Sequence, residues 1–220
     1  MIITPAILPN NFEELHDKLF QLEGVSRRVQ IDLCDGRAGL EKTWLPYKET
    51  HLPNGFEYEF DLMVEDWKKF LPRILLLGGT RVVLHIDEWG SGDFSMLTEI
   101  AKAHPKVSFG FSVTNIGPLD VLVAKVLEFE KEHSKVFVQL MGINKIGAQG
   151  QPFDGRVLSR IEYVKRHARS IPIQIDGSMN PETIFLVKRS GATGAVVGSY
   201  IFNNRNIRKV IDSLHLSFGG

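Results

Sequence analysis

The stretch Val29-Gln30-Ile31-Asp32-Leu33-Cys34-Asp35-Gly36 carries a carboxylate near the end of a short apolar run, just before a glycine. A second stretch, Ile171-Pro172-Ile173-Gln174-Ile175-Asp176-Gly177-Ser178, repeats this arrangement late in the chain. Parallel α/β proteins keep their chemistry at the C-terminal ends of strands. Asp32 and Asp176 are so distant in sequence that they meet only if the sheet closes or nearly closes. The fold therefore decides whether these two carboxylates form one site.

Short β-rich runs alternate with helical patterns from end to end. We expect strands at residues 2–8, 29–33, 56–64, 81–86, 107–113, 136–143, 171–175 and 195–197. Helices are expected at 12–22, 66–77, 93–103, 118–133, 154–168, 181–190 and 203–216, and residues 43–51 form a short helix or a loop. Eight strands alternating with eight connections, without a linker, predict α/β architecture and a single (β/α)8 TIM barrel over residues 1–220. Asp32 and Asp176 would then face each other across the barrel mouth.

Composition excludes several classes of partner. The 220 residues are 43% hydrophobic and 24% charged, and 26 basic against 26 acidic side chains give a formal charge of zero. Such a chain has no global field to attract nucleic acid or an anionic membrane, so a small anionic ligand must be captured locally. The N-terminus lacks a signal-peptide pattern and the apolar runs are shorter than a membrane span. With Cys34 expected to be a buried reduced thiol, we expect a cytoplasmic protein.

Three glycine-bearing segments follow the sixth, seventh and eighth expected strands, where barrels of this kind bind phosphate. They are Gly147-Ala148-Gln149-Gly150-Gln151, Gly177-Ser178 and Gly198-Ser199. Glycine lets backbone N–H groups approach a phosphate closely, and a helix N-terminus behind the turn adds partial positive charge. Each dipeptide alone is weak evidence because Gly-Ser turns are common. Three at consecutive strand ends predict one phosphate site.

Taken together, these segments resemble the ribulose-phosphate 3-epimerase family in collinear order over nearly the whole chain. Residues 30–36 are similar to the family's His-x-Asp-x-Met-Asp-Gly, and residues 61–65 to its His-Leu-Met-Val-Glu. The match continues through residues 5–9 with Pro-Ser-Ile-Leu-Ser, 83–85 with the Val-His of the fourth strand, 151–153 with the end of Gly-Phe-Gly-Gly-Gln-Ser-Phe, 175–178 with Val-Asp-Gly-Gly, and 198–202 with Gly-Ser-Ala-Ile-Phe.

The resemblance implies epimerisation of ribulose 5-phosphate and xylulose 5-phosphate at the carbon beside the ketone. Asp32 and Asp176 would be the acid/base pair, one on each face of the sugar, because a single base returns the proton only to the face it came from. The resemblance also implies that Met63 and Met141 lie over the sugar and exclude water. It implies a homo-oligomer whose small-molecule partner is a phosphorylated sugar.

The metal site is where the chain departs from the family. The family binds a divalent metal through two histidines and two aspartates, and the histidine positions here hold Gln30 and Asp61. The implied ligands, Gln30, Asp32, Asp61 and Asp176, are all oxygen donors, which favours Mg²⁺ or Mn²⁺ over Zn²⁺. Without a cation, three carboxylates at one spot would repel and hold a proton among them. Either a harder metal replaces the usual one, or the metal is absent and the protein binds a sugar phosphate with altered or no catalysis.

Further alternatives concern single positions. Decarboxylases and hexulose-phosphate synthases, lyases on related barrels, carry Asp-x-Lys-x-x-Asp at the third strand, and this chain has that spacing from Asp61 to Asp66 with Met63 in place of the lysine. Methionine cannot deliver a proton, and Asp66 reads equally well as a helix N-cap.

His85 is a substitute ligand, a group that polarises the carbonyl, or a neutral hydrogen-bonded barrel histidine. Aromatic and apolar residues of the 43–51 connection pack at an oligomer interface or cover the mouth: Trp44, Leu45 and Tyr47.

Overall fold

The structure is a computed structural model that describes residues 1–36, 42–47, 51–87, 89–144 and 150–218. Eight parallel strands close into a barrel in sequence order, and β8 pairs with β1 to complete it. The strands are β1 (Ile2–Ile7), β2 (Arg28–Cys34), β3 (Glu57–Met63), β4 (Gly79–His85), β5 (Ser108–Val113), β6 (Val136–Met141), β7 (Ile173–Asp176) and β8 (Gly194–Val197). The predicted (β/α)8 architecture is confirmed.

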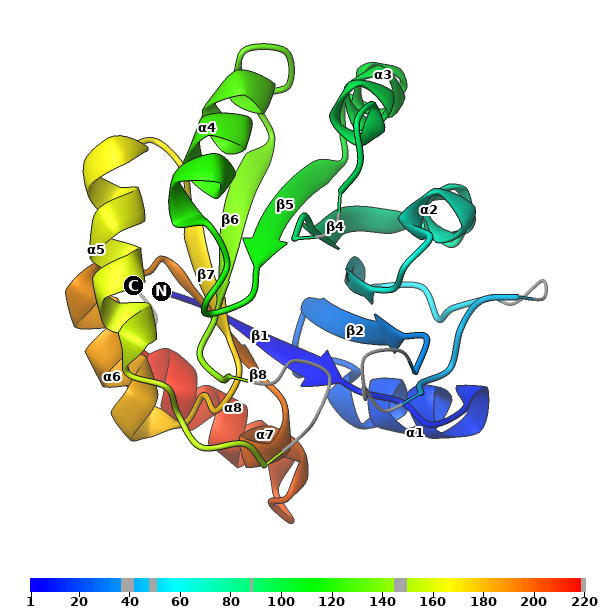
Figure 1. Cartoon of the computed structure of the whole chain (residues 1–220). Helices are drawn as coiled ribbons and strands as arrows, with labels where there is room; N and C mark the ends of the chain where they lie inside the picture. Colours follow the sequence, from blue (N-terminus) through cyan, green and yellow to red (C-terminus); the bar gives the residue numbers. More distant parts are fainter. Residues whose placement is uncertain (37–41, 48–50, 88, 145–149, 219–220) are drawn as a thin grey trace.

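Helices lie outside the ring of strands (Figure 1). They are α1 (Phe12–Leu22), α2 (Trp67–Leu76), α3 (Asp93–Ala103), α4 (Leu119–Glu130), α5 (Arg156–His167), α6 (Pro181–Ser190), α7 (Ser199–Phe202) and α8 (Ile207–Phe218). The described residues between β2 and β3 contain no helix, so the 43–51 connection is a loop where the structure describes it. The single turn of α7 directly after β8 was not predicted.

Local sequence explains where the helices begin and which face they bury. In α1 the Asn11 side chain accepts a hydrogen bond from Glu14 N at 2.9 Å, an N-cap, and an apolar stripe at helical spacing is fully buried: Leu15, Leu19 and Leu22. Asn180 caps α6 in a capping box with Thr183, and Pro181 takes the first turn. Asp66 stands at the N-cap of α2 without a side-chain cap hydrogen bond.

In the barrel interior, a large side chain on one strand fills the space left by a glycine on the next strand. Gly110 on β5 is the register partner of Phe137 on β6. A Cβ at Gly110 would lie 2.5 Å from Phe137 Cε2, so the ring occupies the space that the glycine leaves open. Above this packed level, toward the C-terminal ends of the strands, the inward positions become polar.

Met1, before β1, and Phe218, the last residue of α8, are in direct contact. The Met1 ammonium donates to Phe218 O at 2.9 Å, and Lys188 Nζ donates to the same oxygen at 3.1 Å. These contacts hold the end of α8 against the start of β1 and against α6. Within the described residues, no helix has both the length and the apolar character needed to cross a membrane.

We predict that Gly110→Ala destabilises the protein by about 1–3 kcal/mol, because the new methyl group overlaps the Phe137 ring in a closed interior. Gly155→Ala is the matched control: it adds the same methyl group where nothing lies within 4 Å, at a φ of −61°. Denaturant unfolding of both variants checks this. Equal stability of the two would show that the barrel interior is not packed in this way.

Candidate active site

Three aspartates from three strands converge at the C-terminal end of the barrel. Asp32 on β2 and Asp61 on β3 are register partners, and Asp176 comes from the end of β7. One oxygen of each lies within 4.8 Å of the others. Asp61 is fully buried, whereas Asp32 and Asp176 are half-buried. Closure of the sheet brings together residues that are far apart in the sequence.

A pocket opens above these carboxylates. Asp32 and Asp176 line it, and so do these other residues singled out from the sequence: Met63, Met141, Gly150, Gln151, Gly177, Ser178, Gly198 and Ser199. Asp61 and Gln30 lie beneath the pocket. Gly147 falls outside the described residues.

On one side of the pocket, side-chain hydroxyl groups donate hydrogen bonds to backbone oxygens and join the glycine loops. Ser178 Oγ donates to Gln151 O, which joins the loop after β7 to the loop after β6. Gly177 has a φ of +104°, and a Cβ there would lie 2.7 Å from the Ile143 side chain, so this turn needs glycine. Thr183 Oγ1 donates to Ser178 O at 2.8 Å and holds the turn against α6. The loops after β6 and β7 therefore form one wall.

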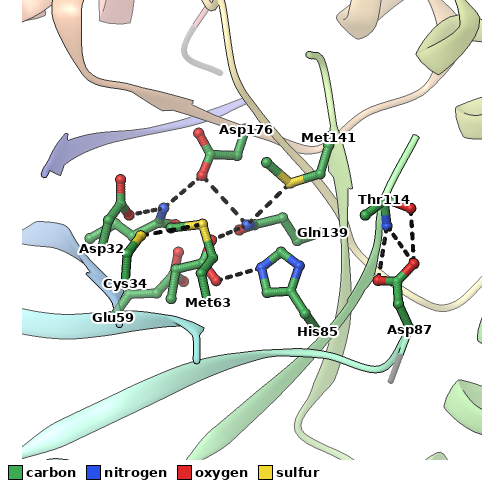
Figure 2. Close-up of polar contacts among 12 residues, drawn as sticks. Asp32, Cys34, Glu59, Met63, His85, Asp87, Thr114, Gln139, Met141 and Asp176 are labelled. Carbon is green, nitrogen blue, oxygen red and sulfur yellow. Dashed lines mark hydrogen bonds and ion pairs between the residues drawn. The ribbon is translucent and has the colours of Figure 1, made fainter. Parts of the chain in front are cut away.

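Amide groups of two glutamines hold the carboxylates. Gln30 Nε2 donates to Asp32 Oδ1 and to Asp176 Oδ2, both at 2.8 Å. Gln139 Nε2 donates to Asp61 Oδ2 at 2.7 Å and lies 3.5 Å from Asp176 Oδ2 (Figure 2). The nitrogen of Gln30 thus faces the carboxylates, and its oxygen faces Gln174 at 3.3 Å. As arranged here, Gln30 is a hydrogen-bond donor rather than an oxygen ligand.

His85 at the end of β4 contacts Asp61 and not the pocket. Its Nε2 lies 2.8 Å from Asp61 Oδ1, and Nδ1 is buried without a hydrogen-bond partner among the described residues. Burial lowers the pKa of His85, but the charge and hydrogen bond of Asp61 outweigh burial, and the pKa is raised. Of the three interpretations of His85, this contact favours the hydrogen-bonded barrel histidine, although the raised pKa runs against the neutral form expected from the sequence.

Burial and mutual repulsion make the half-buried aspartates reluctant to ionise. Burial raises the pKa of Asp32 well above its usual range, and the charges of Asp176 and Asp61 raise it further. Burial followed by the charge of Asp61 raises the pKa of Asp176 to about 7, against the opposing hydrogen bond from Gln30. At neutral pH the cluster therefore retains a proton, as the sequence led us to expect.

Four polar residues beneath the acids were not predicted from the sequence: Glu59, Arg81, Gln139 and Gln174. Glu59 lies two positions before Asp61, and Gln174 two positions before Asp176, just as Gln30 precedes Asp32. Strand side chains repeat every second residue on one face, so each polar partner points into the barrel one level below its acid. The repeated pattern of an amide or acid, one residue, then aspartate is the signal that could have found Glu59 and Gln174, whereas Arg81 and Gln139 precede Val83 and Met141 and carry no such signal.

Three methionines line the pocket: Met63, Met141 and Met179. Met63 is 6% exposed and its Sδ lies 3.9 Å from the buried Cys34 Sγ. Burial raises the pKa of the Cys34 thiol, which keeps it neutral. Met63 occupies the position of the lysine in related lyases and brings no proton-transferring group to the mouth.

The aromatic residues of the second connection pack on their own chain. Trp44 lies against Phe12, with ring centroids 5.5 Å apart, and Leu45 is buried. Tyr47 contacts Phe70 at 5.6 Å and remains half exposed. Of the three, Tyr47 leaves the most surface open to a second subunit.

The donor set fits a divalent cation. Three carboxylate oxygens within 4.8 Å of one another are hard ligands. The raised pKa values of Asp32 and Asp176 reflect negative charge that the surrounding protein does not fully compensate. Such a cluster accepts either protons or a cation such as Mg²⁺ or Mn²⁺. Asp32, Asp61 and Asp176 are the residues that could hold it.

A closed (β/α)8 barrel with paired acids and glycine turns at its C-terminal mouth has the layout of TIM-barrel enzymes, whose active sites lie at that end of the strands. The solved structure of a 3-hexulose-6-phosphate synthase matches this fold with a TM-score of 0.65 at 18% identity, covering 99% of each chain. Residues 2–202 match the ribulose-phosphate 3 epimerase family, and the chain belongs to that family.

Individual relatives match over nearly their full length. A ribulose-phosphate 3-epimerase of Helicobacter pylori strain J99 is 35% identical over 97% of this chain and 96% of its own. The cytoplasmic isoform from Oryza sativa subsp. japonica is 27% identical over 99% of this chain and 94% of its own. The predicted resemblance to the epimerase family is confirmed.

We predict that Asp32→Asn stabilises the protein at pH 8. The raised pKa values mean that the folded state binds protons more tightly than the unfolded chain. Between the ordinary carboxyl pKa and the raised pKa of the folded state, about 7 for Asp176, the unfolded chain therefore loses its protons first, and stability falls as pH rises. Removing one charge should raise Tm by about 2–4 °C at pH 8 and by less at pH 5. Thermal unfolding beside the exposed control Asp17→Asn measures this, and no difference from the control would contradict it.

We also predict that Mg²⁺ or Mn²⁺ raises the Tm of chelator-treated protein at pH 8 and has little effect at pH 5. The carboxylates must lose their protons before they bind a cation. Asp32→Asn should remove most of the effect. Stabilisation that is equal at both pH values, or kept in Asp32→Asn, would place the cation elsewhere.

Proposed function

We propose that the protein epimerises a phosphorylated ketose of the ribulose 5-phosphate and xylulose 5-phosphate type by proton transfer at the carbon beside the ketone. The observation that carries this proposal is that Asp32 and Asp176, from separate strands, line the same pocket and share the Gln30 amide. One carboxylate removes the C3 proton and leaves an enediolate. The other delivers a proton to the opposite face, which inverts the centre.

The protonation pattern of the cluster suits this chemistry. Inversion needs one carboxylate and one carboxylic acid at the start of each turnover. Burial and repulsion raise the pKa of both aspartates, so that a proton is retained at neutral pH. Because the acid and base exchange roles in the reverse direction, a shared proton serves both substrates.

The remaining pocket residues supply binding and exclude water. The loops carrying Gly150, Gln151, Gly177, Ser178, Gly198 and Ser199 suit a phosphate group, because glycine backbone approaches an anion closely. Met63 and Met141 border the pocket near the aspartates, and apolar atoms there limit the access of water to an enediolate. A divalent cation on Asp32, Asp61 and Asp176 would supply Lewis-acid stabilisation of the enediolate oxygens.

A cytosolic location and a homo-oligomeric state belong to this proposal. The Oryza sativa relative is named a cytoplasmic isoform, and the reduced, buried Cys34 agrees with a reducing compartment. The half-exposed Tyr47 supports a subunit contact near the second connection.

The direct test is exchange of the C3 hydrogen of ribulose 5-phosphate in deuterated water with added Mn²⁺ or Mg²⁺, followed by NMR. We expect exchange together with conversion to xylulose 5-phosphate. Asp32→Asn and Asp176→Asn should each slow interconversion by about 10²- to 10⁴-fold, while exchange in one epimer falls less because the remaining base still acts on its own face. Exposed Asp17→Asn should match the unmodified protein.

Two results of the exchange experiment would contradict the proposed epimerase function. Binding of ribulose 5-phosphate without exchange, whichever divalent metal is added, would make the protein a non-catalytic phosphosugar-binding barrel. Release of a shorter product would favour lyase chemistry instead.

A further inference from the structure

A buried polar layer lies directly below the three aspartates. Gln174 is its centre: Gln174 Nε2 lies 2.5 Å from Glu59 Oε1, 2.8 Å from Gln139 Oε1 and 3.3 Å from Gln30 Oε1. Gln174 Oε1 accepts from Arg81 Nη2 at 3.4 Å. Arg81 and Glu59 form an ion pair at the base of the layer. Gln174 therefore connects a pair of fixed charges to both glutamines that hold the catalytic acids.

The charges at the base decide which way Gln174 points. A guanidinium group only donates hydrogen bonds and an ionised carboxylate only accepts them. The Gln174 oxygen must face Arg81 and its nitrogen must face Glu59. The amide nitrogen carries two hydrogens: Glu59 accepts one, Gln139 Oε1 accepts the other at 2.8 Å, and Gln30 Oε1 at 3.3 Å shares it. The neighbouring amides therefore turn their oxygens to Gln174.

The same orientation is then required at the top of the layer. With their oxygens turned toward Gln174, Gln30 and Gln139 present their N–H groups to the aspartates. Turning either amide over would set oxygen against carboxylate above and nitrogen against nitrogen below. Both glutamines and Glu59 are fully buried and Gln174 is 6% exposed, so water cannot replace a lost partner cheaply.

We propose that Gln174, held by the Glu59–Arg81 ion pair, is a positioning residue that fixes the amide direction of Gln30 and Gln139 and so keeps the three aspartates in their reacting arrangement. This inference rests on the proposed epimerase function. Gln174 is not among the pocket-lining residues and acts through Gln30 and Gln139. Its loss should therefore change the chemical step more than the binding of substrate.

The kinetic test uses Gln174→Met, which keeps the length of the side chain but removes its donor and acceptor. We expect kcat to fall about tenfold or more while KM stays within about twofold. Gln21→Met makes the same change on the exposed face of α1 and should leave both constants unaltered. A raised KM with unchanged kcat would overturn the proposal.

A double variant distinguishes positioning from packing. Because Gln174 acts partly through Gln30, Gln30→Met combined with Gln174→Met should lose less activity than the product of the two single losses. Full additivity would show that the two side chains act independently and would overturn the proposal. If Gln174→Met does not fold, Gln174→Asn makes the same comparison, since it keeps a neutral amide but shortens it by one methylene and withdraws it from Gln30 and Gln139.

A spectroscopic measurement needs no activity. In ¹⁵N-labelled protein, the side-chain NH₂ signals of Gln30 and Gln139 should exchange slowly with solvent, and in Gln174→Met they should shift and exchange faster. Gln21→Met should leave them in place. Unchanged signals in Gln174→Met overturn this inference even if the enzyme is active. Changed signals in a protein without epimerase activity support the amide layer and overturn the proposed function alone.

Discussion

Repulsion among three carboxylates at one end of a closed sheet is the constraint around which this site is built. At 4.8 Å, the separation within which the oxygens of Asp32, Asp61 and Asp176 lie, two unit charges repel by about 3 kcal/mol at an effective dielectric constant of 20. Closure of the barrel forces this proximity, because β2, β3 and β7 belong to one continuous hydrogen-bonded ring. This repulsion is tolerable only where protons, hydrogen-bond donors or a cation compensate the negative charge.

The hydrogen-bond donors come from buried side chains beside the acids, on β2, β4 and β6. Gln30 and Gln139 turn their N–H groups toward the acids, and His85 contributes a contact to Asp61. Replacing imidazole ligands by an amide and a carboxylate thus leaves the acid pair in place but changes how it is supported. The site combines a negatively charged mouth with a buried hydrogen-bond network, an arrangement that keeps a proton available at the cost of stability.

The sequence alone predicted the barrel and the acid pair. The alternation of strand and helix patterns predicted the barrel, and paired acids before glycine turns predicted that Asp32 and Asp176 meet. The turn of α7 was missed because Gly198 and Ser199 read as a loop, and four residues carry too little periodicity to indicate a helix. Glu59, Arg81, Gln139 and Gln174 were missed because each alone is an ordinary polar residue inside a strand.

By itself, the sequence determined the order of the elements, the period-two spacing that aims each acid and its polar partner into one interior, and the oxygen-only character of the acid cluster. These follow from local periodicity and residue chemistry. The tertiary structure decided which atoms face one another. Gln30, expected as an oxygen ligand, presents its nitrogen because Gln174, 144 positions away, takes its oxygen. An amide has two chemically opposite ends, and only its partners in space determine which end is used.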